Sequence, residues 1–140
     1  MLKIVDWELA GLGDPLWDVG SLFSAYLSFW LLFVPITTGT GPRHCVELAR
    51  YPLEKMQSAL RAFWQSYVRG MQLDSKTAEQ MLVRAVKYSA ARLVQTCYEQ
   101  MHTSSQLIGN VVCSLQLSLN ILKRPREASN ELLGIPVFAN

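Results

Sequence analysis

The chain has 140 residues, enough for one domain with a hydrophobic core. Half of the residues are hydrophobic and 17% are charged, a composition that excludes a disordered tail. The net charge of +2 comes from 13 basic and 11 acidic residues without a long basic run, so we expect no nucleic-acid partner.

A short strand is the first expected element, from Leu2 to Trp7, because this segment is rich in Ile and Val and alternates weakly. A strand needs a neighbour for its backbone hydrogen-bonding groups. No second convincing strand occurs nearby, so its neighbour is expected to be missing from this chain. The loop from Ala10 to Pro15 follows, in which Asp14 is a good N-cap and Pro15 suits the first helical position.

The first helix is expected from Pro15 to about Phe33, and its apolar length raises the question of a membrane span. The segment LWDVGSLFSAYLSFWLLFV, residues 16–34, is nearly long enough to cross a bilayer. Asp18 and the lack of Lys/Arg asymmetry in the flanks argue against a span. We therefore expect a buried core helix and no membrane partner. Four small residues suit close packing of this helix in a core: Gly20, Ser21, Ser24 and Ser28.

Three further helices are expected after a loop rich in proline, glycine and threonine. The first covers residues 53–69, where apolar residues recur with a period of about 3.6, and is closed by Gly70. The second starts at residue 74 or 75 and ends near 102, and the third runs from 104 or 105 to 123. The tail from Arg126 has weak periodicity and is expected to be irregular.

The fold class predicted from these elements is mainly α, a bundle of about four helices with one short N-terminal strand. We divide the chain into a strand and loop at residues 1–14, a helical subdomain at 15–125 and a tail at 126–140.

The cysteines and histidines do not indicate a metal site. Cys45, Cys97 and Cys113 are odd in number and widely spaced, which fits neither a disulfide framework nor a CxxC motif. A reducing compartment, the cytoplasm, is therefore expected. His44 stands next to Cys45 and His102 is alone, so both are expected to be surface or packing residues.

The most specific pattern is KIVDWELAGLGDPLWDVGSLF, residues 3–23. It resembles the strand, the A-G-x-G-D-P loop and the helix start of aminoglycoside phosphotransferases, choline kinases and their relatives. Such a resemblance implies a protein-kinase-like fold, of which this chain would be the C-terminal part of the large lobe. Seven family positions occur in the correct order: Asp6, Trp7, Glu8, Gly13, Asp14, Pro15 and Asp18.

By this resemblance, Asp6 takes the place of the aspartate that ligates the Mg²⁺ shared with the phosphates of ATP. A carboxylate is the hard oxygen ligand that Mg²⁺ prefers, and a strand end can hold it rigidly. Without the resemblance, an aspartate that merely ends a strand would be favoured. Glu8 would point to the same side of a strand and is a secondary metal candidate, with a solvated carboxylate as the alternative.

Asp14, Asp18 and Trp7 are expected to support the site structurally. Asp14 is expected to cap the helix. A carboxylate in an apolar helix needs hydrogen-bond donors if it is buried. By resemblance, the donors for Asp18 are backbone groups of the catalytic loop. The alternative for Asp18 is an exposed carboxylate favoured by the helix dipole.

No catalytic residue is expected in this chain. The family's glycine-rich loop, paired strand lysine and H-G-D-x-x-x-x-N catalytic loop all lie upstream of the Asp6 position. The resemblance therefore implies the C-terminal portion of an ATP- and Mg²⁺-dependent phosphotransferase that is inactive as an isolated chain and binds neither cofactor tightly. Its partners would be the missing N-terminal half, or a partner protein, and a small acceptor that carries a hydroxyl.

The acceptor is not specified by the sequence, because few acidic residues are available to recognise a polycationic aminoglycoside. Between residues 53 and 122 they are Glu54, Asp74, Glu79 and Glu99. Two alternatives remain for the whole chain. It could be a non-catalytic helical module that binds a partner protein through an exposed apolar face, or a small membrane protein that spans the bilayer through residues 16–34.

Overall fold

The structure is a computed structural model that describes residues 11–34, 51–103 and 109–137. The regular elements within these ranges are all helical, so the prediction of a mainly α fold is confirmed. The predicted strand at residues 2–7 lies outside the described residues. The elements in chain order are α1 (Leu16–Leu31), α3 (Leu53–Gly70), α4 (Ser75–Thr103), α5 (Gly109–Lys123), α6 (Pro125–Glu127) and the π-helical turn η2 (Ala128–Leu132).

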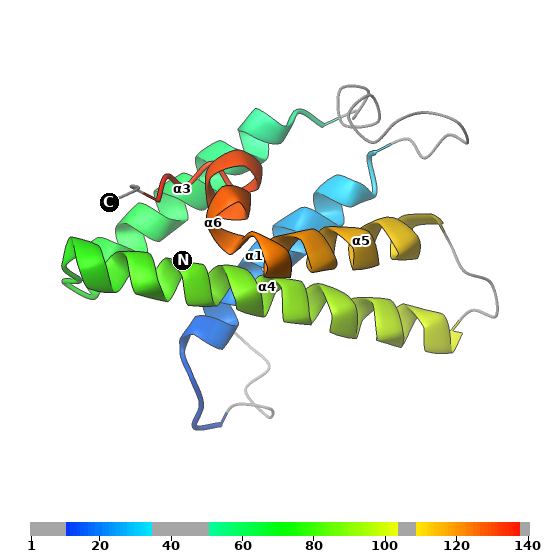
Figure 1. Ribbon diagram of the computed structural model, residues 1–140, viewed down its shortest axis with the longest axis horizontal. Helices are drawn as coiled ribbons and strands as arrows, with labels where there is room; N and C mark the ends of the chain where they lie inside the picture. Colours follow the sequence, from blue (N-terminus) through cyan, green and yellow to red (C-terminus); the bar gives the residue numbers. More distant parts are fainter. Residues whose placement is uncertain (1–10, 35–50, 104–108, 138–140) are drawn as a thin grey trace, which may run out of the picture.

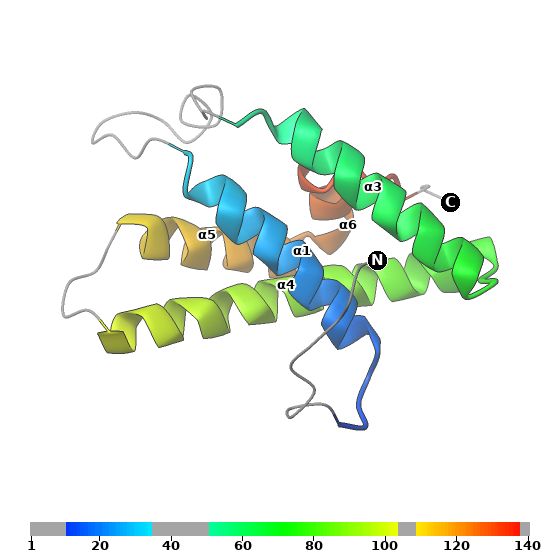
Figure 2. The same cartoon turned by 180° about the vertical axis from the view of Figure 1, so that it is seen from behind.

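Helix α4 is the longest of the described elements and contacts α1, α5, α6 and η2 (Figure 1). Helix α1 crosses α4, and α5 runs beside α4 in the opposite direction. The view from behind shows α1 in front of α4 (Figure 2). Helix α3 leads into the start of α4, and the C-terminal segment returns to lie against α3.

The hydrophobic core lies where α1 meets α3 and α4. Phe23 and Leu27 of α1 are completely buried. The Phe23 ring makes edge contacts with Phe63 and Trp64 of α3, with centroids 6.2 and 6.5 Å apart. The prediction that α1 is a buried core helix is therefore confirmed. In residues 11–34, 51–103 and 109–137, no helix combines the length and the hydropathy that a bilayer crossing requires.

Small residues bring α1 and α4 into close contact. A Cβ atom at Gly20 would lie 2.8 Å from the carbonyl oxygen of Ala85 and 2.9 Å from the backbone nitrogen of Ser89. Ala85 and Ser89 are themselves fully buried. The α1 backbone thus rests directly on the α4 backbone at Gly20, an approach that a side chain larger than hydrogen would prevent.

The end of α3 differs from the prediction that Gly70 closes it. Gly70 is the last helical residue, and the left-handed residue is Gln72, with φ of 52°. The N–H of Gln72 donates to the carbonyl of Arg69 at 3.1 Å, and the N–H of Leu73 donates to the carbonyl of Val68 at 3.1 Å. These two bonds form a Schellman motif, in which the left-handed position is usually glycine.

We expect Gln72→Gly to raise the free energy of unfolding by about 0.5–1 kcal/mol, because a left-handed conformation costs a residue with a Cβ about 1–2 kcal/mol. The greater backbone entropy that glycine loses on folding offsets part of the gain. Urea denaturation followed by circular dichroism measures the change. Gln65→Gly is the matched control, because it places glycine inside the same helix and should cost about 1 kcal/mol. A loss of stability in Gln72→Gly equal to that of the control would contradict the assignment.

The prediction of an irregular tail is wrong for residues 126–132, which lie in α6 and η2. The C-terminal part of the chain is hydrogen-bonded to α3. Arg61 Nε donates to the carbonyl of Gly134 at 2.9 Å, and Gln57 Nε2 donates to the carbonyl of Glu131 at 2.7 Å. The segment contributes three buried side chains to the core: Leu133, Ile135 and Val137.

Candidate functional site

Two of the predicted site residues, Asp14 and Asp18, lie in the described part of the chain, at the start of α1. Asp6, Trp7 and Glu8 lie outside the described residues, so the metal ligands stay a prediction. The described geometry therefore concerns the loop and helix end that would support the metal site.

Asp14 holds the start of α1 through both its backbone and its side chain. Its Oδ1 accepts a hydrogen bond from the N–H of Leu16 at 3.0 Å. Its carbonyl oxygen accepts from the N–H of Trp17 at 2.9 Å. Pro15, between them, already has helical torsion angles (φ −60°, ψ −19°) and lacks a backbone donor. The prediction that Asp14 caps the helix is confirmed by these bonds.

The second carboxylate oxygen of Asp14 ties this helix start to α4. Oδ2 accepts from Arg84 Nη1 at 2.9 Å and from the Tyr88 hydroxyl at 3.0 Å. Arg84 and Tyr88 are four residues apart and so project from the same side of α4. Asp14 therefore accepts side-chain bonds from two residues about 70 positions away. Arg84 and Tyr88 were not predicted as partners of Asp14. Their spacing places them on one side of a helix but does not indicate which distant residue that side contacts.

These contacts shift the pKa values of all three side chains. The hydrogen bond from Arg84, followed by the one from the Leu16 N–H, lowers the pKa of Asp14. The same hydrogen bond to Asp14 raises the pKa of Arg84. The bond from the Tyr88 hydroxyl to Asp14, followed by burial, raises the pKa of Tyr88. The network is thus built for an ionised Asp14 and a protonated Tyr88.

The pKa of Asp14 predicts how its contribution to stability depends on pH. The folded-state pKa lies below the unfolded value, so the contribution is complete above the unfolded pKa of about 4 and is lost as pH falls through the folded pKa. Asn can still cap the helix through its single oxygen, so Asp14→Asn removes the charge and the second oxygen, which accepts from Arg84 and Tyr88. We expect the variant to be less stable than the wild type at pH 7 and the difference to shrink below about pH 4.

Urea denaturation of both proteins at pH 7, 5 and 3 measures this difference. Asp74→Asn is the matched control for the coupling to Arg84. Asp74 also caps a helix, and the hydrogen bond from the Thr77 hydroxyl is the largest cause of its lowered pKa. The effect of Asp74→Asn should therefore be additive with that of Arg84→Gln. Combining Asp14→Asn with Arg84→Gln should add little to the effect of either change alone. A difference that is independent of pH, or full additivity with Arg84→Gln, would contradict the network.

Aromatic contacts extend the network along α4. The rings of Trp17 and Tyr88 meet edge to face with centroids 5.4 Å apart. The guanidinium carbon of Arg92 lies 5.9 Å from the Trp17 ring centroid, within the range of a cation–π contact. Arg84, Tyr88 and Arg92 recur every four residues, so one stripe of α4 contacts Asp14 and Trp17 at the start of α1.

Asp18 lies in the first turn of α1 and is exposed. This placement agrees with the alternative interpretation, a solvated carboxylate that interacts favourably with the helix dipole. Asp18 is not buried in the described part of the chain, so its carboxylate does not need hydrogen-bond donors from within the bundle. The role of Asp18 as an acceptor for a catalytic loop stays a prediction.

The described cysteines and histidine do not form a metal site. Within residues 11–34, 51–103 and 109–137, no three His, Cys, Asp or Glu side chains gather as metal ligands do. Cys97 and Cys113 are free thiols, and burial raises the pKa of Cys97. His102 is exposed, and its ring lies 4.4 Å from that of Tyr98. His44 and Cys45 lie outside the described residues.

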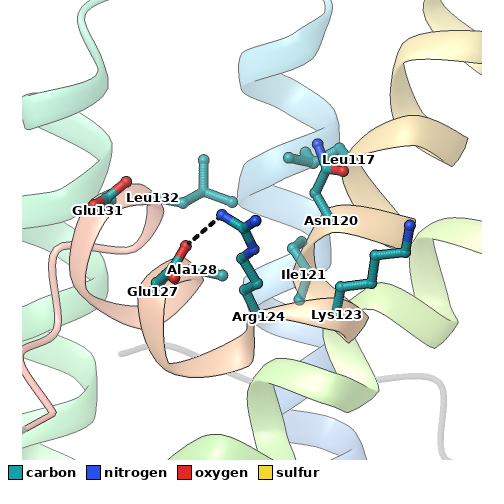
Figure 3. Close-up of a pocket in the computed structure, with 9 residues that line it drawn as sticks. All are labelled: Leu117, Asn120, Ile121, Lys123, Arg124, Glu127, Ala128, Glu131 and Leu132. Atoms are coloured by element: carbon teal, nitrogen blue, oxygen red, sulfur yellow. Dashed lines mark hydrogen bonds and ion pairs between the residues drawn. The ribbon is translucent and has the colours of Figure 1, made fainter.

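A cavity of about 470 Å³ lies between α5 and the α6–η2 turn (Figure 3). Arg124 reaches across it to Glu127, with 3.3 Å between Nη1 and Oε2. Lys123 and Glu131 also line the cavity, so its charges balance. Its lining comes from residues 117–132 and includes none of the residues that hold the start of α1.

Two of the basic residues that follow α5 form ion pairs. Arg124 pairs with Glu127, and Arg126 forms an ion pair with Glu79 of α4.

Comparisons of the chain with protein-family models, with curated proteins and with solved structures found no match. The resemblance carried by residues 3–23 is thus a hypothesis, whereas the network that fixes the start of α1 is a property of the structure.

Proposed function

We propose that the chain is the C-terminal portion of an ATP- and Mg²⁺-dependent phosphotransferase of the aminoglycoside phosphotransferase and choline kinase type. The observation that carries the proposal is the ordered set of seven family positions between Asp6 and Asp18. The acceptor would be a small molecule with a hydroxyl group, and the other half of the nucleotide site would be supplied by a separate N-terminal lobe.

The described geometry supports the proposal at the loop that follows the metal-binding segment. Phosphoryl transfer depends on groups held in fixed positions, because catalysis consists of positioning and charge stabilisation. Asp14 fixes its end of that loop with four hydrogen bonds, to Leu16, Trp17, Arg84 and Tyr88. These bonds fix the end of the loop where α1 begins.

The role assigned to each residue follows from its carboxylate, which can ligate a metal ion or accept hydrogen bonds. The carboxylate of Asp6 would ligate Mg²⁺, which neutralises charge on the transferring phosphates, and Glu8 would contact the metal or its water. Asp14 would brace the loop. Asp18, which is exposed, is available to accept hydrogen bonds from a neighbouring segment.

The proposal is tested by expressing the reading frame extended upstream and measuring Mg²⁺-dependent phosphate transfer from ATP to a panel of small alcohols and amino sugars. Asp6→Asn should reduce kcat by about a thousandfold, because a metal ligand contributes several kcal/mol to transition-state stabilisation. Asp74→Asn is the matched control, since it makes the same change at a helix cap on α4 and should leave the rate unchanged.

The isolated 140-residue chain should show neither turnover nor tight ATP binding. An active isolated chain, or an extended protein that is unaffected by Asp6→Asn, would contradict the proposal.

A second candidate function, a helical module that binds a partner protein, is supported by exposed apolar side chains at the C-terminal end of α1. Phe29 is 52% exposed and Leu32 is 62% exposed. The Phe29 ring contacts Phe33 and Tyr51, with centroids 5.0 and 6.3 Å apart. Sedimentation of the isolated chain separates the two functions. Self-association that Phe29→Ser abolishes would favour the module, and a monomer at all concentrations would count against it.

A further inference from the structure

A groove of about 680 Å³ lies where α3, the first turns of α4 and the C-terminal segment meet. Figure 1 shows these three parts at the same end of the molecule. The groove shares no residue with the cavity of Figure 3 or with the network at the start of α1. Its volume is within the range of small-molecule binding sites, which is about 300–1,000 Å³.

The floor of the groove is apolar. Trp64 and Val68 come from α3, Leu82 comes from α4, and the C-terminal segment adds Ile135 and Val137. These side chains belong to the hydrophobic core or pack against it, so the packed fold holds them in place. An apolar group in the groove would therefore be bound by a floor that exists before the ligand arrives.

The charged residues around the groove are predominantly basic. Arg61 and Arg69, two turns apart on α3, and Lys76, in the first turn of α4, line it. In the described part of the chain, none of the three forms an ion pair with a carboxylate. Arg61 Nε donates to the carbonyl of Gly134, and Arg69 Nη2 donates to the Ser66 hydroxyl at 3.4 Å.

The nearby carboxylates are already engaged. Glu79, the acidic residue that lines the groove, is paired with Arg126. Asp74 precedes Lys76 in the sequence and accepts hydrogen bonds from the backbone N–H groups of Lys76 and Thr77 at 3.0 Å. The groove thus combines an apolar floor with three cations that lack a carboxylate partner among the described residues.

We infer that this groove binds a small organic carboxylate with an apolar body, such as a medium-chain alkyl carboxylate. The apolar body would lie on the floor formed by Trp64, Val68 and Val137. The carboxylate would lie at the basic rim, where arginine can bind both of its oxygens. This inference does not rest on the proposed phosphotransferase function, because none of the residues that line the groove has a role in that function.

The inference is tested by titrating the ¹⁵N-labelled 140-residue chain with octanoate, octanol and octylammonium, which share an alkyl body and differ in charge. Octanoate should shift the amide signals of Val68, Leu73 and Val137 and should bind at least about tenfold more tightly than octylammonium. Shortening the chain from octanoate to hexanoate should weaken binding by about tenfold, since each buried CH₂ contributes about 0.8 kcal/mol.

The rim is tested with Arg69→Gln/Lys76→Gln, which should weaken octanoate binding about tenfold and leave octanol binding unchanged. Lys55→Gln/Lys87→Gln is the matched control, because it removes two exposed cations from the same helices outside the groove and should leave octanoate binding unchanged. Equal binding of octanoate and octylammonium, or equal losses in both double variants, would overturn the inference. It would also fall if the shifts occurred at Leu117 and Ile121, which line the other cavity.

Discussion

Gly20→Ala is expected to lower the free energy of unfolding by about 2 kcal/mol, although alanine is the better helix former by about 1 kcal/mol. The new methyl group would lie 2.6 Å from Cβ of Tyr88, 2.8 Å from the carbonyl oxygen of Ala85 and 2.9 Å from the nitrogen of Ser89. None of these atoms can move by rotation of a side chain. Relief of the clash therefore requires α1 and α4 to separate, which loosens the core between them.

The comparison with Gly70→Ala isolates this effect. Gly70 also lies in a helix, but no atom is within 4 Å of its missing Cβ. The substitution there should raise the free energy of unfolding by up to about 1 kcal/mol, through helix propensity and reduced entropy of the unfolded chain. Urea denaturation of the two variants should therefore give changes of opposite sign. A stabilised Gly20→Ala variant would show that α1 and α4 do not cross at this residue.

Phe23→Ala is expected to lower the free energy of unfolding by about 3–5 kcal/mol, the range for removing a buried aromatic side chain. Phe23 is completely buried, and its ring contacts Phe63 and Trp64 of α3. The loss combines the transfer free energy of the side chain with the cavity left between α1 and α3. Such a change is a large part of the stability of a domain of this size, so the variant should be partly unfolded at moderate temperature.

Phe29→Ala makes the same change at a position of α1 where the side chain is 52% exposed. It should cost less than about 1 kcal/mol, because little apolar area is lost and no cavity forms. Thermal unfolding followed by circular dichroism measures both variants. Similar losses in the two would contradict the assignment of the buried face of α1.

The helical part of the fold could be predicted from the sequence because its apolar residues recur with the helix period over long segments. The predicted helix at 53–69 corresponds to α3, and the one from 74 or 75 to 102 corresponds to α4. The C-terminal segment was missed because it is stabilised by tertiary contacts with α3, such as those of Gln57 and Arg61, which no local pattern reveals. The alternation of Leu133, Ile135 and Val137 was the available signal, since every second residue is apolar and buried.

The candidate site was predictable to a smaller extent. Capping by Asp14 follows from local chemistry, because an aspartate before a proline and an apolar segment is a typical helix start. The bonds from Arg84 and Tyr88 could not be predicted, because they depend on how α1 crosses α4. Exposure of Asp18 likewise depends on which side of α1 faces the core, and the first turn alone does not determine that.

Whether the chain is part of a phosphotransferase is decided by the genomic DNA sequence upstream of the codon for Met1. We expect an open frame, continuous with this chain, that encodes an H-G-D-x-x-x-x-N catalytic loop before Asp6 and a strand lysine further upstream. A stop codon in that frame close to Met1, with neither motif encoded nearby in any frame, would contradict the claim.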